Sequence, residues 1–189
     1  VKRLWVLGTG AEDFELTFNQ KHEILEKCVG FKNNYFKIYS GCTFSSFKET
    51  RLFIKICNKY KLAGIHYLCQ NKLISLDLLE KFYKEIAKIS LNPVYAYSSA
   101  NWGKFIPPIF ISKLKNINNI KGIKFSTSNI VHTELALSLA DENFEVIPAV
   151  VKQLLPSLIL GCKSFTTVEA SIFLEEINKI VCSFIEKDF

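Results

Sequence analysis

Short apolar runs alternate along this chain with longer stretches of helical period, and this alternation restricts the possible folds more than any other feature. The strand-and-helix units recur about every 25 to 30 residues, and no hairpin turn links one apolar run to the next. Parallel strands cannot be joined by a tight turn, so this order predicts an α/β fold with a parallel sheet and crossover helices.

Seven strands and seven helices are expected. The strands are Arg3–Gly8, Asn34–Gly41, Leu62–Leu68, Pro93–Ser98, Ile120–Ser126, Phe144–Ala149 and Cys162–Val168. The helices are Phe18–Val29, Phe47–Tyr60, Leu76–Ile89, Pro108–Lys115, Ile130–Leu139, Val151–Leu160 and Glu169–Lys187. Capping boxes, in which side chains satisfy the free amides of the first turn, are expected at Thr17 to Gln20 and at Ser46 to Glu49.

An open doubly wound sheet and a closed eight-stranded barrel both fit this pattern. No strand is followed by the GxGxxG turn of dinucleotide-binding sheets, and the units have similar lengths, as the repeats of a ring do. We therefore expect an incomplete (β/α)8 TIM barrel, in which the first strand and helix are missing and two edges are unpaired.

Composition narrows the function classes. The 189 residues are 49% hydrophobic and 22% charged, which is enough for one core and a single domain over residues 1–189. The 24 basic and 18 acidic residues are scattered, which is typical of a solvated surface and argues against a nucleic-acid partner. No apolar run is long enough to span a membrane. The cysteines stand singly and the histidines lack metal-ligand spacing, so we expect free thiols, a cytoplasmic location and no metal.

The strand Ile120–Ser126 carries the strongest candidate for chemistry. Alternation places Gly122 and Lys124 on one face and Ile123 and Phe125 on the other, which suits the layer beneath the helices. Lys124 is then directed into the barrel near the carboxyl end of its strand, where barrel enzymes keep their active sites. Loss of hydration there lowers the pKa of an amine from about 10.4 and provides a nucleophile. A lysine that extends to solvent at the strand end is the alternative.

Two further features stand at strand ends. Tyr95 and Tyr97 point the same way from the fourth strand, and a phenol can relay protons, although barrel-filling aromatics are the alternative. Gly8, Thr9 and Gly10 form a small-residue turn whose backbone amides could hold a carboxylate, although a plain strand-to-helix turn is the alternative.

The turn "GTGAE" (8–12), the strand "PVYAYS" with Tyr97 and the strand "IKGIKFS" with Lys124 together resemble the dihydrodipicolinate synthase / N-acetylneuraminate lyase family of class I aldolases. The resemblance covers essentially the whole chain, from the family's second barrel strand through its eighth, and leaves the first strand and the C-terminal helical segment outside it. It implies that Lys124 forms a Schiff base with pyruvate or another 2-keto acid and that no further cofactor is needed.

The resemblance also implies roles for the other motifs. Tyr97 would relay protons, Thr9 would support that tyrosine, and the backbone near Gly8, Thr9 and Gly10 would hold the substrate carboxylate. Family members usually assemble as dimers of dimers, so a homo-oligomer, dimer or tetramer, is expected.

Two departures from the family pattern concern substrate binding. Gly10 and Ala11 stand where the family's turn "GTTGE" has Thr and Gly, which keeps the backbone amides and removes one hydroxyl. Asn101 and Trp102 stand in the region of the arginine that recognises the distal carboxylate in the synthases. We therefore expect an activity other than lysine biosynthesis.

Other departures concern the proton relay and the pocket. The family's paired tyrosines after its fourth strand fall near Gln70 and Asn71, so the relay is incomplete or Tyr67 or Tyr95 substitutes. The aromatic side chains around the expected pocket favour a substrate less polar than a sialic acid. The residues expected to line the pocket are Tyr95, Asn101, Trp102, Phe165, Thr166 and Thr167.

Three hypotheses follow. The first is a 2-keto-acid-dependent lyase, of aldolase or synthase type, that makes or cleaves a carbon–carbon bond through an imine on Lys124. The second is a catalytically impaired family member that binds a 2-keto acid as a regulatory or binding module. The third is an unrelated parallel barrel in which Lys124 is structural.

Overall fold

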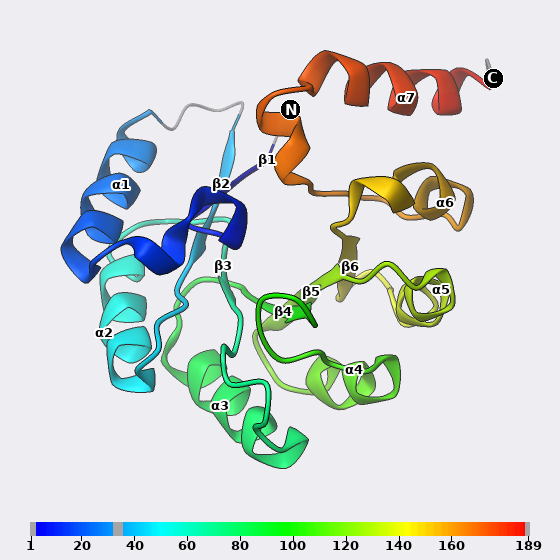
Figure 1. The fold of residues 1–189 in the computed structure, drawn as a ribbon. Coiled ribbons are helices and arrows are strands. Elements are labelled where there is room, and N and C mark those ends of the chain that lie inside the picture. Colours follow the sequence, from blue (N-terminus) through cyan, green and yellow to red (C-terminus); the bar gives the residue numbers. More distant parts are fainter. Residues whose placement is uncertain (1–2, 32–35, 188–189) are drawn as a thin grey trace.

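A computed structural model describes residues 3–31 and 36–187 of the chain. Six parallel strands form one sheet in the order β1-β2-β3-β4-β5-β6, so each strand lies beside its neighbours in the chain (Figure 1). The strands are β1 (Arg3–Val6), β2 (Lys37–Gly41), β3 (Gly64–Tyr67), β4 (Val94–Ser99), β5 (Ile120–Ser126) and β6 (Glu145–Pro148). The predicted α/β class and parallel sheet are confirmed. Residues 34–35 of the second predicted strand lie outside the described residues.

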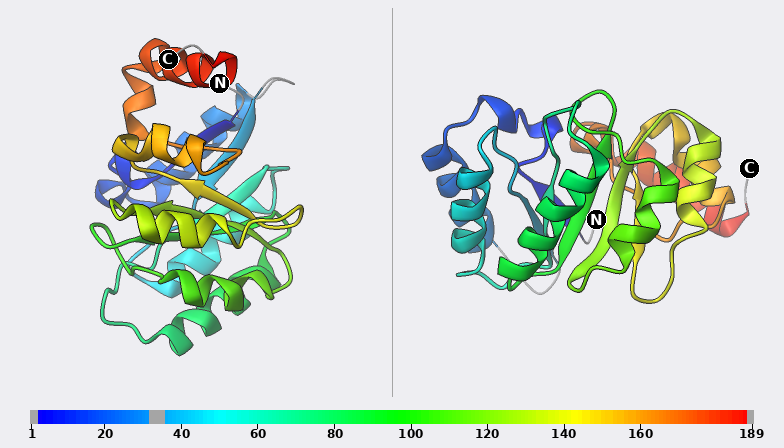
Figure 2. Two further views of the ribbon diagram at one scale, coloured as in Figure 1. Left: turned by 90° about the vertical axis from the view of Figure 1, so that its right-hand side faces the viewer. Right: turned by 90° about the horizontal axis from the view of Figure 1, so that it is seen from below.

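Helices follow the strands and surround the sheet on its outer side (Figures 1 and 2). The α-helices are α1 (Phe18–Gly30), α2 (Phe47–Cys57), α3 (Leu76–Ile89), α4 (Pro108–Lys115), α5 (Ile130–Leu137), α6 (Leu154–Ile159) and α7 (Leu174–Glu186). Short 3-10 turns are η1 (Thr9–Ala11), η2 (Asp13–Glu15), η3 (Val151–Gln153) and η4 (Val168–Ser171). The sheet curls into an incomplete barrel. In the described part of the chain, none of these helices has the length and apolar character needed to cross a membrane.

Two hydrophobic clusters lie on the two faces of the curled sheet. The larger one fills the layer between strands and helices and contains Ile123 and Phe125 of β5. The smaller one, Tyr39, Tyr95 and Ile147, packs with Trp5 on the inner face. Because β5 contributes alternate residues to the two faces, Lys124 lies on the inner face, as its spacing predicted.

The expected strand Cys162–Val168 is not a strand. Residues 162–167 have no regular secondary structure, and among the described residues a single backbone hydrogen bond, from the Thr166 N–H to the Pro148 carbonyl at 3.1 Å, joins this segment to β6. A ladder needs repeated hydrogen bonds to a neighbour, and within the described residues no strand flanks the outer edge of this segment. The prediction of a seventh strand is therefore wrong.

The helix starts test the two predicted capping boxes. Thr17 and Gln20 form a complete box at the start of α1. Ser46 makes no side-chain cap hydrogen bond, so the second box is wrong, although α2 still begins at Phe47. The Thr50 N–H bonds to the Ser46 carbonyl at 3.1 Å, and Glu49 lies in the first turn, where a carboxylate is favourable.

Candidate active site

Lys124 and Tyr97 occupy neighbouring positions on the inner face of β5 and β4. The Lys124 Nζ lies 4.3 Å from the centroid of the Tyr97 ring, within the range of a cation–π contact. Burial lowers the pKa of Lys124 to about 8, while the negative charge of Asp13 acts in the opposite direction. A pKa near 8 leaves about one amine in ten unprotonated at pH 7.

Tyr97 is fixed from two sides. Its Oη lies 3.0 Å from the Thr9 Oγ1, and its backbone N–H donates to the Tyr83 Oη at 3.2 Å. Burial raises the pKa of Tyr97, and the hydrogen bond with Thr9 partly offsets that rise. The phenol is therefore neutral at physiological pH and can pass a proton through the Thr9 hydroxyl.

The turn after β1 has an unusual backbone. Leu7 adopts a φ of 55°, and the carbonyl of Gly8 accepts from the Ala11 N–H at 2.8 Å, which closes η1. Gly41 on β2 makes room for this turn, because a Cβ there would lie 1.7 Å from the Leu7 carbonyl oxygen. The first N–H groups of such a turn have no partner inside it, which is the arrangement that anion-binding turns use.

A buried ion pair lies beside this turn and was not expected from the sequence. The Lys21 Nζ contacts the Asp13 Oδ2 at 3.4 Å and donates to the Thr43 carbonyl at 2.8 Å. The side chains of Lys21 and Asp13 are only 3% and 2% exposed. Burial raises the pKa of Asp13, and Lys21 opposes this rise. The one signal in the sequence is that Lys21 precedes the buried Leu25 by one helical turn.

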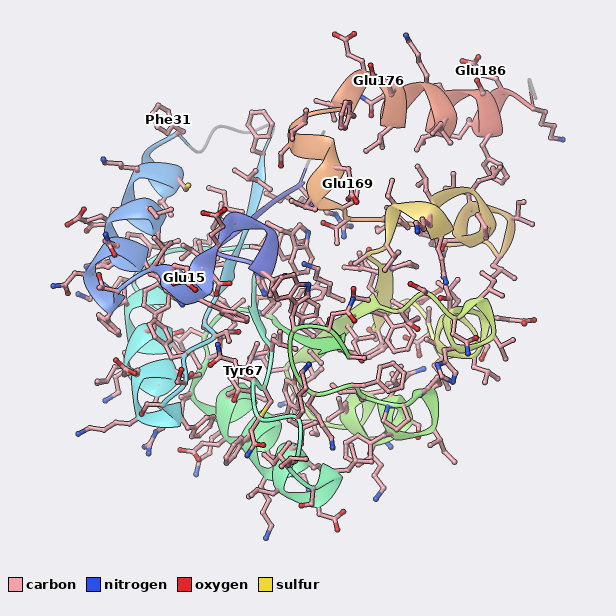
Figure 3. The ribbon with its side chains drawn as sticks, in the orientation of Figure 1. Glu15, Phe31, Tyr67, Glu169, Glu176 and Glu186 are labelled. Carbon is pink, nitrogen blue, oxygen red and sulfur yellow. The ribbon has the colours of Figure 1, made fainter. Side chains whose placement is uncertain are left out.

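Tyr95 and Tyr67 lie away from the Lys124 amine. Tyr95 is paired with Gly122, two residues before Lys124, and its ring packs edge-on against Trp5 with centroids 5.6 Å apart. Tyr67, labelled in Figure 3, belongs to the outer cluster. Its ring centroid lies 5.7 Å from that of Tyr83. An alternative relay through Tyr67 is therefore wrong, because this phenol is directed under the helices.

The other expected pocket residues fall in two separate places. Asn101 lines a cavity of about 400 Å³ with Ser126, Asn129 and His132, at the carboxyl ends of β4 and β5. Trp102 is 53% exposed in the same loop. The segment Phe165, Thr166 and Thr167 lines a second cavity with Trp5, on the side where β1 has no neighbouring strand.

No metal-ligand cluster accompanies this site. Within the described ranges, no three side chains of His, Cys, Asp or Glu come together as a metal site would require. Cys42, Cys57 and Cys69 are free thiols buried in the outer core. Lys124, Tyr97 and the Thr9 turn are thus the groups that the fold brings together at the carboxyl end of the sheet.

The fold and this arrangement define an α/β-barrel protein with a part-buried lysine at the mouth of the barrel. Residues 1–188 match the Dihydrodipicolinate synthetase family. The chain belongs to that family, which lies within the Schiff-base-forming class I aldolase superfamily, and the hypothesis of an unrelated barrel is excluded.

Individual relatives agree with this assignment. The chain is 24% identical over 178 residues to 4-hydroxy-tetrahydrodipicolinate synthase from Sulfurihydrogenibium sp., covering 93% of this chain and 61% of the relative. It is 28% identical over 171 residues to N-acetylneuraminate lyase A from Xenopus laevis, covering 85% and 55%. The chain thus spans about three fifths of the length of such relatives.

Solved structures share the fold. Dihydrodipicolinate synthase from Aquifex aeolicus superposes with a TM-score of 0.90 at 21% identity, covering 100% of this chain and 66% of that one. A prophage protein of the dihydrodipicolinic acid synthase family from E. coli K12, solved in complex with pyruvate, gives 0.92 at 18% identity, covering 100% and 65%.

Proposed function

We propose that this protein is a 2-keto-acid-dependent carbon–carbon lyase, of aldolase or synthase type, in which Lys124 is the imine-forming residue. One observation supports the proposal most: a part-buried amine, with a pKa lowered to about 8, lies over the ring of a tyrosine that is hydrogen-bonded to Thr9. An imine on lysine needs no metal or dissociable cofactor.

Imine formation is the first step. The unprotonated Lys124 amine adds to the keto carbon, and the carbonyl oxygen takes up two protons and leaves as water. The nitrogen keeps one hydrogen and a positive charge. The substrate carboxylate would bind the N–H groups of Thr9 and Gly10, at the turn that Gly41 accommodates.

Carbon–carbon cleavage follows. The bond that breaks joins the α-carbon, which is attached to the imine carbon, to the β-carbon, which carries a hydroxyl. Its electrons move into the protonated imine, which gives an enamine and releases the β-carbon as an aldehyde. The Tyr97 oxygen accepts the proton of the substrate hydroxyl that becomes the aldehyde as the phenol passes its own proton to the Thr9 hydroxyl. The same relay run in reverse delivers a proton to the enamine carbon, and water then hydrolyses the imine. The synthase direction is the reverse of the cleavage step.

A catalytically impaired 2-keto-acid binder is the second candidate. Asn101 and Trp102 stand in the region of the synthases' distal arginine, and neither of these two side chains carries a positive charge for a second carboxylate. Trp102 is also 53% exposed. A protein that forms the pyruvate imine and exchanges no proton at the pyruvate methyl group would have this second function.

Assembly and location are further parts of the proposal. A homodimer or homotetramer is expected from the family's usual assembly. A cytoplasmic location is expected from the single, unpaired cysteines. Sedimentation velocity of the natural full-length protein would measure the oligomeric state.

The test is reductive trapping. The full-length protein is incubated with pyruvate and sodium borohydride, and the tryptic peptide that carries Lys124 is examined by mass spectrometry for the reduced adduct. Lys124→Ala should abolish the adduct. Lys121→Ala, which removes an exposed lysine three residues earlier on the same strand, should leave it intact. An adduct that persists in Lys124→Ala, or that never forms with several 2-keto acids, contradicts the proposal.

A further inference from the structure

His66 occupies the inner face of β3, where barrels are usually filled by branched apolar side chains. It is 1% exposed. Its ring lies 5.1 Å from that of Trp5 and 6.2 Å from that of Tyr97, measured between centroids. A polar ring in this layer is costly unless both of its nitrogens are satisfied.

Only one of the two nitrogens is satisfied by the protein. The His66 Nε2 lies 3.3 Å from the backbone carbonyl of Val6. A carbonyl can only accept, so Nε2 carries the hydrogen and Nδ1 carries a lone pair. Nδ1 is buried and has no hydrogen-bonding partner among the described residues. His66 is therefore a buried acceptor that lacks a donor.

The nearest cation is Lys124, and Gly8 leaves open the space between the two side chains. A Cβ on Gly8 would lie 3.6 Å from the His66 Cε1 and 3.9 Å from the Lys124 Nζ. The His66 Cε1, which is bonded to Nδ1, thus borders the same small space as the amine. Within the described residues, the Lys124 Nζ contacts the Tyr97 ring and has no hydrogen-bond acceptor.

Burial and the charge of Lys124 keep the His66 imidazole neutral, so that Nδ1 remains a hydrogen-bond acceptor. Burial, and then the positive charge of Lys124, lower the pKa of His66 to about 3. The other titratable groups around the pair are Asp13 from η2 and Tyr97 from β4, together with Tyr95, which is paired in register with His66, and Tyr39 of β2, whose ring contacts that of Tyr95. Of these, Asp13 is the only carboxylate, and its Oδ2 is already bound by Lys21.

We propose that His66 is a positioning residue for the imine, whose Nδ1 accepts a hydrogen bond from the nitrogen of Lys124. This inference rests on the proposed function. This hydrogen bond is not formed in the structure, where neither nitrogen has a partner among the described residues. It requires the Lys124 side chain to turn from the Tyr97 ring toward His66. Its donor is the ammonium or amine before reaction and the single N–H of the protonated imine afterwards. In a dry pocket that N–H needs an acceptor, and a neutral imidazole provides one without adding charge.

Three variants separate this role from a structural one. His66→Phe removes both nitrogens and keeps a ring. His66→Asn keeps a polar atom close to the place of Nδ1, and His66→Gln keeps one close to the place of Nε2, which contacts Val6. Asp13→Asn is the comparator, because it removes the negative charge that acts on Lys124 and keeps His66.

Two readouts are made on the full-length protein. The first is the pH midpoint of acetylation of Lys124 by acetic anhydride, measured by mass spectrometry, which needs no substrate. The second is the yield of the borohydride-trapped pyruvate adduct. A neutral acceptor favours the cationic nitrogen, so His66→Phe should lower the midpoint by about one pH unit and the adduct yield about tenfold. In His66→Asn, the acetylation midpoint and the adduct yield should both lie close to the wild-type values. In His66→Gln, both should be as low as in His66→Phe.

An unchanged midpoint and yield in a folded His66→Phe would overturn the inference. Recovery by His66→Gln with none by His66→Asn would overturn it as well, because the Val6 contact would then be the one that matters. If His66→Phe does not fold, the inference is tested by comparing the acetylation midpoint and the adduct yield of His66→Asn with those of His66→Gln. A wild-type protein that forms no adduct refutes the proposed function, and the acetylation midpoints still decide the role of His66.

Discussion

At the scale of single residues, Lys124 differs from an exposed lysine because the barrel removes water from its amine. The pKa falls from the usual 10.5 of a lysine to about 8, even though the charge of Asp13 favours the ammonium form. Desolvation therefore outweighs this attraction. Tyr97 supplies the other side of the site, and its phenol is held by a hydroxyl that comes from a turn far away in sequence.

This pKa predicts how imine formation depends on pH. Below pH 8 the amine is mostly protonated and cannot add to a carbonyl, so the rate of borohydride trapping with pyruvate should rise as the pH passes through about 8 and level off about one unit above. Initial trapping rates between pH 6 and 10 would measure the midpoint. A rate that still rises steeply at pH 10 would show that the amine keeps the pKa of a hydrated lysine.

Tyr97→Phe should separate binding from proton transfer. The variant loses the hydroxyl that meets Thr9 at 3.0 Å and keeps the ring beneath Lys124, so the pyruvate adduct should still form. Exchange of the pyruvate methyl protons for deuterium, followed by NMR in D2O, should slow by about 10² to 10⁴.

Tyr83→Phe is the matched control for that variant. Its hydroxyl donates to the Tyr67 carbonyl and accepts from the Tyr97 N–H beneath the helices, so its loss should reduce stability by about 1–3 kcal/mol and leave exchange much faster than in Tyr97→Phe. Equal exchange rates in the two variants would contradict a role for the Tyr97 hydroxyl in proton transfer.

At the scale of elements, the turn after β1 is held against the rest of the sheet by buried polar contacts. Lys21 on α1 bridges Asp13 of η2 and the Thr43 carbonyl beyond β2, and its amine lies 4.2 Å from the centroid of the Phe44 ring. The loops that carry the candidate carboxylate-binding turn are thus fixed by one side chain.

Lys21→Met should be strongly destabilising. The change leaves the 2% exposed Asp13 without its cation, and loss of one partner of a buried ion pair costs about 3–5 kcal/mol. Arg51→Met is the control, because its pair with Glu85 at 3.0 Å is largely exposed and should contribute less than about 1 kcal/mol. Urea unfolding at pH 7 would measure both, and equal midpoints would contradict the structural role of Lys21.

At the scale of the whole molecule, the curled sheet is open on one side. Among the strands of residues 3–31 and 36–187, β1 pairs with β2 alone, and one backbone hydrogen bond joins the segment 162–168 to β6. Between them lies a cavity of about 520 Å³, lined partly by apolar side chains of α7 such as Leu174 and Val181. The exposed Glu176 and Glu186 also belong to α7, which packs mainly on α6 (Figure 3).

This asymmetry predicts a gradient of local stability. β4 and β5 are hydrogen-bonded to strands on both sides and are largely buried, so their amides should exchange with deuterium slowly. The amides of residues 163–168 and of β1 should exchange much faster under the same conditions. Hydrogen exchange followed by mass spectrometry would measure this difference, and uniform protection across the sheet would contradict it.

The sequence by itself determined the features that depend on local periodicity. The starts of α1, α3 and α4 were predicted at the residues where they occur, since caps and helical period act over a few residues. The period of two in β5 was enough to place Lys124 on the inner face, because side chains of a strand alternate whatever its neighbours are.

Only the tertiary structure decided which distant residues meet. Thr9 reaches Tyr97 across 88 positions, and His66 shares the space left by Gly8 with Lys124, because the curl and the register of the strands bring them together. The sequence cannot distinguish a buried lysine such as Lys21 from a solvated one, since burial depends on what packs over the helix. The segment 162–168 has the composition of a strand and still lacks a ladder, because a strand exists only where a neighbour offers its hydrogen bonds.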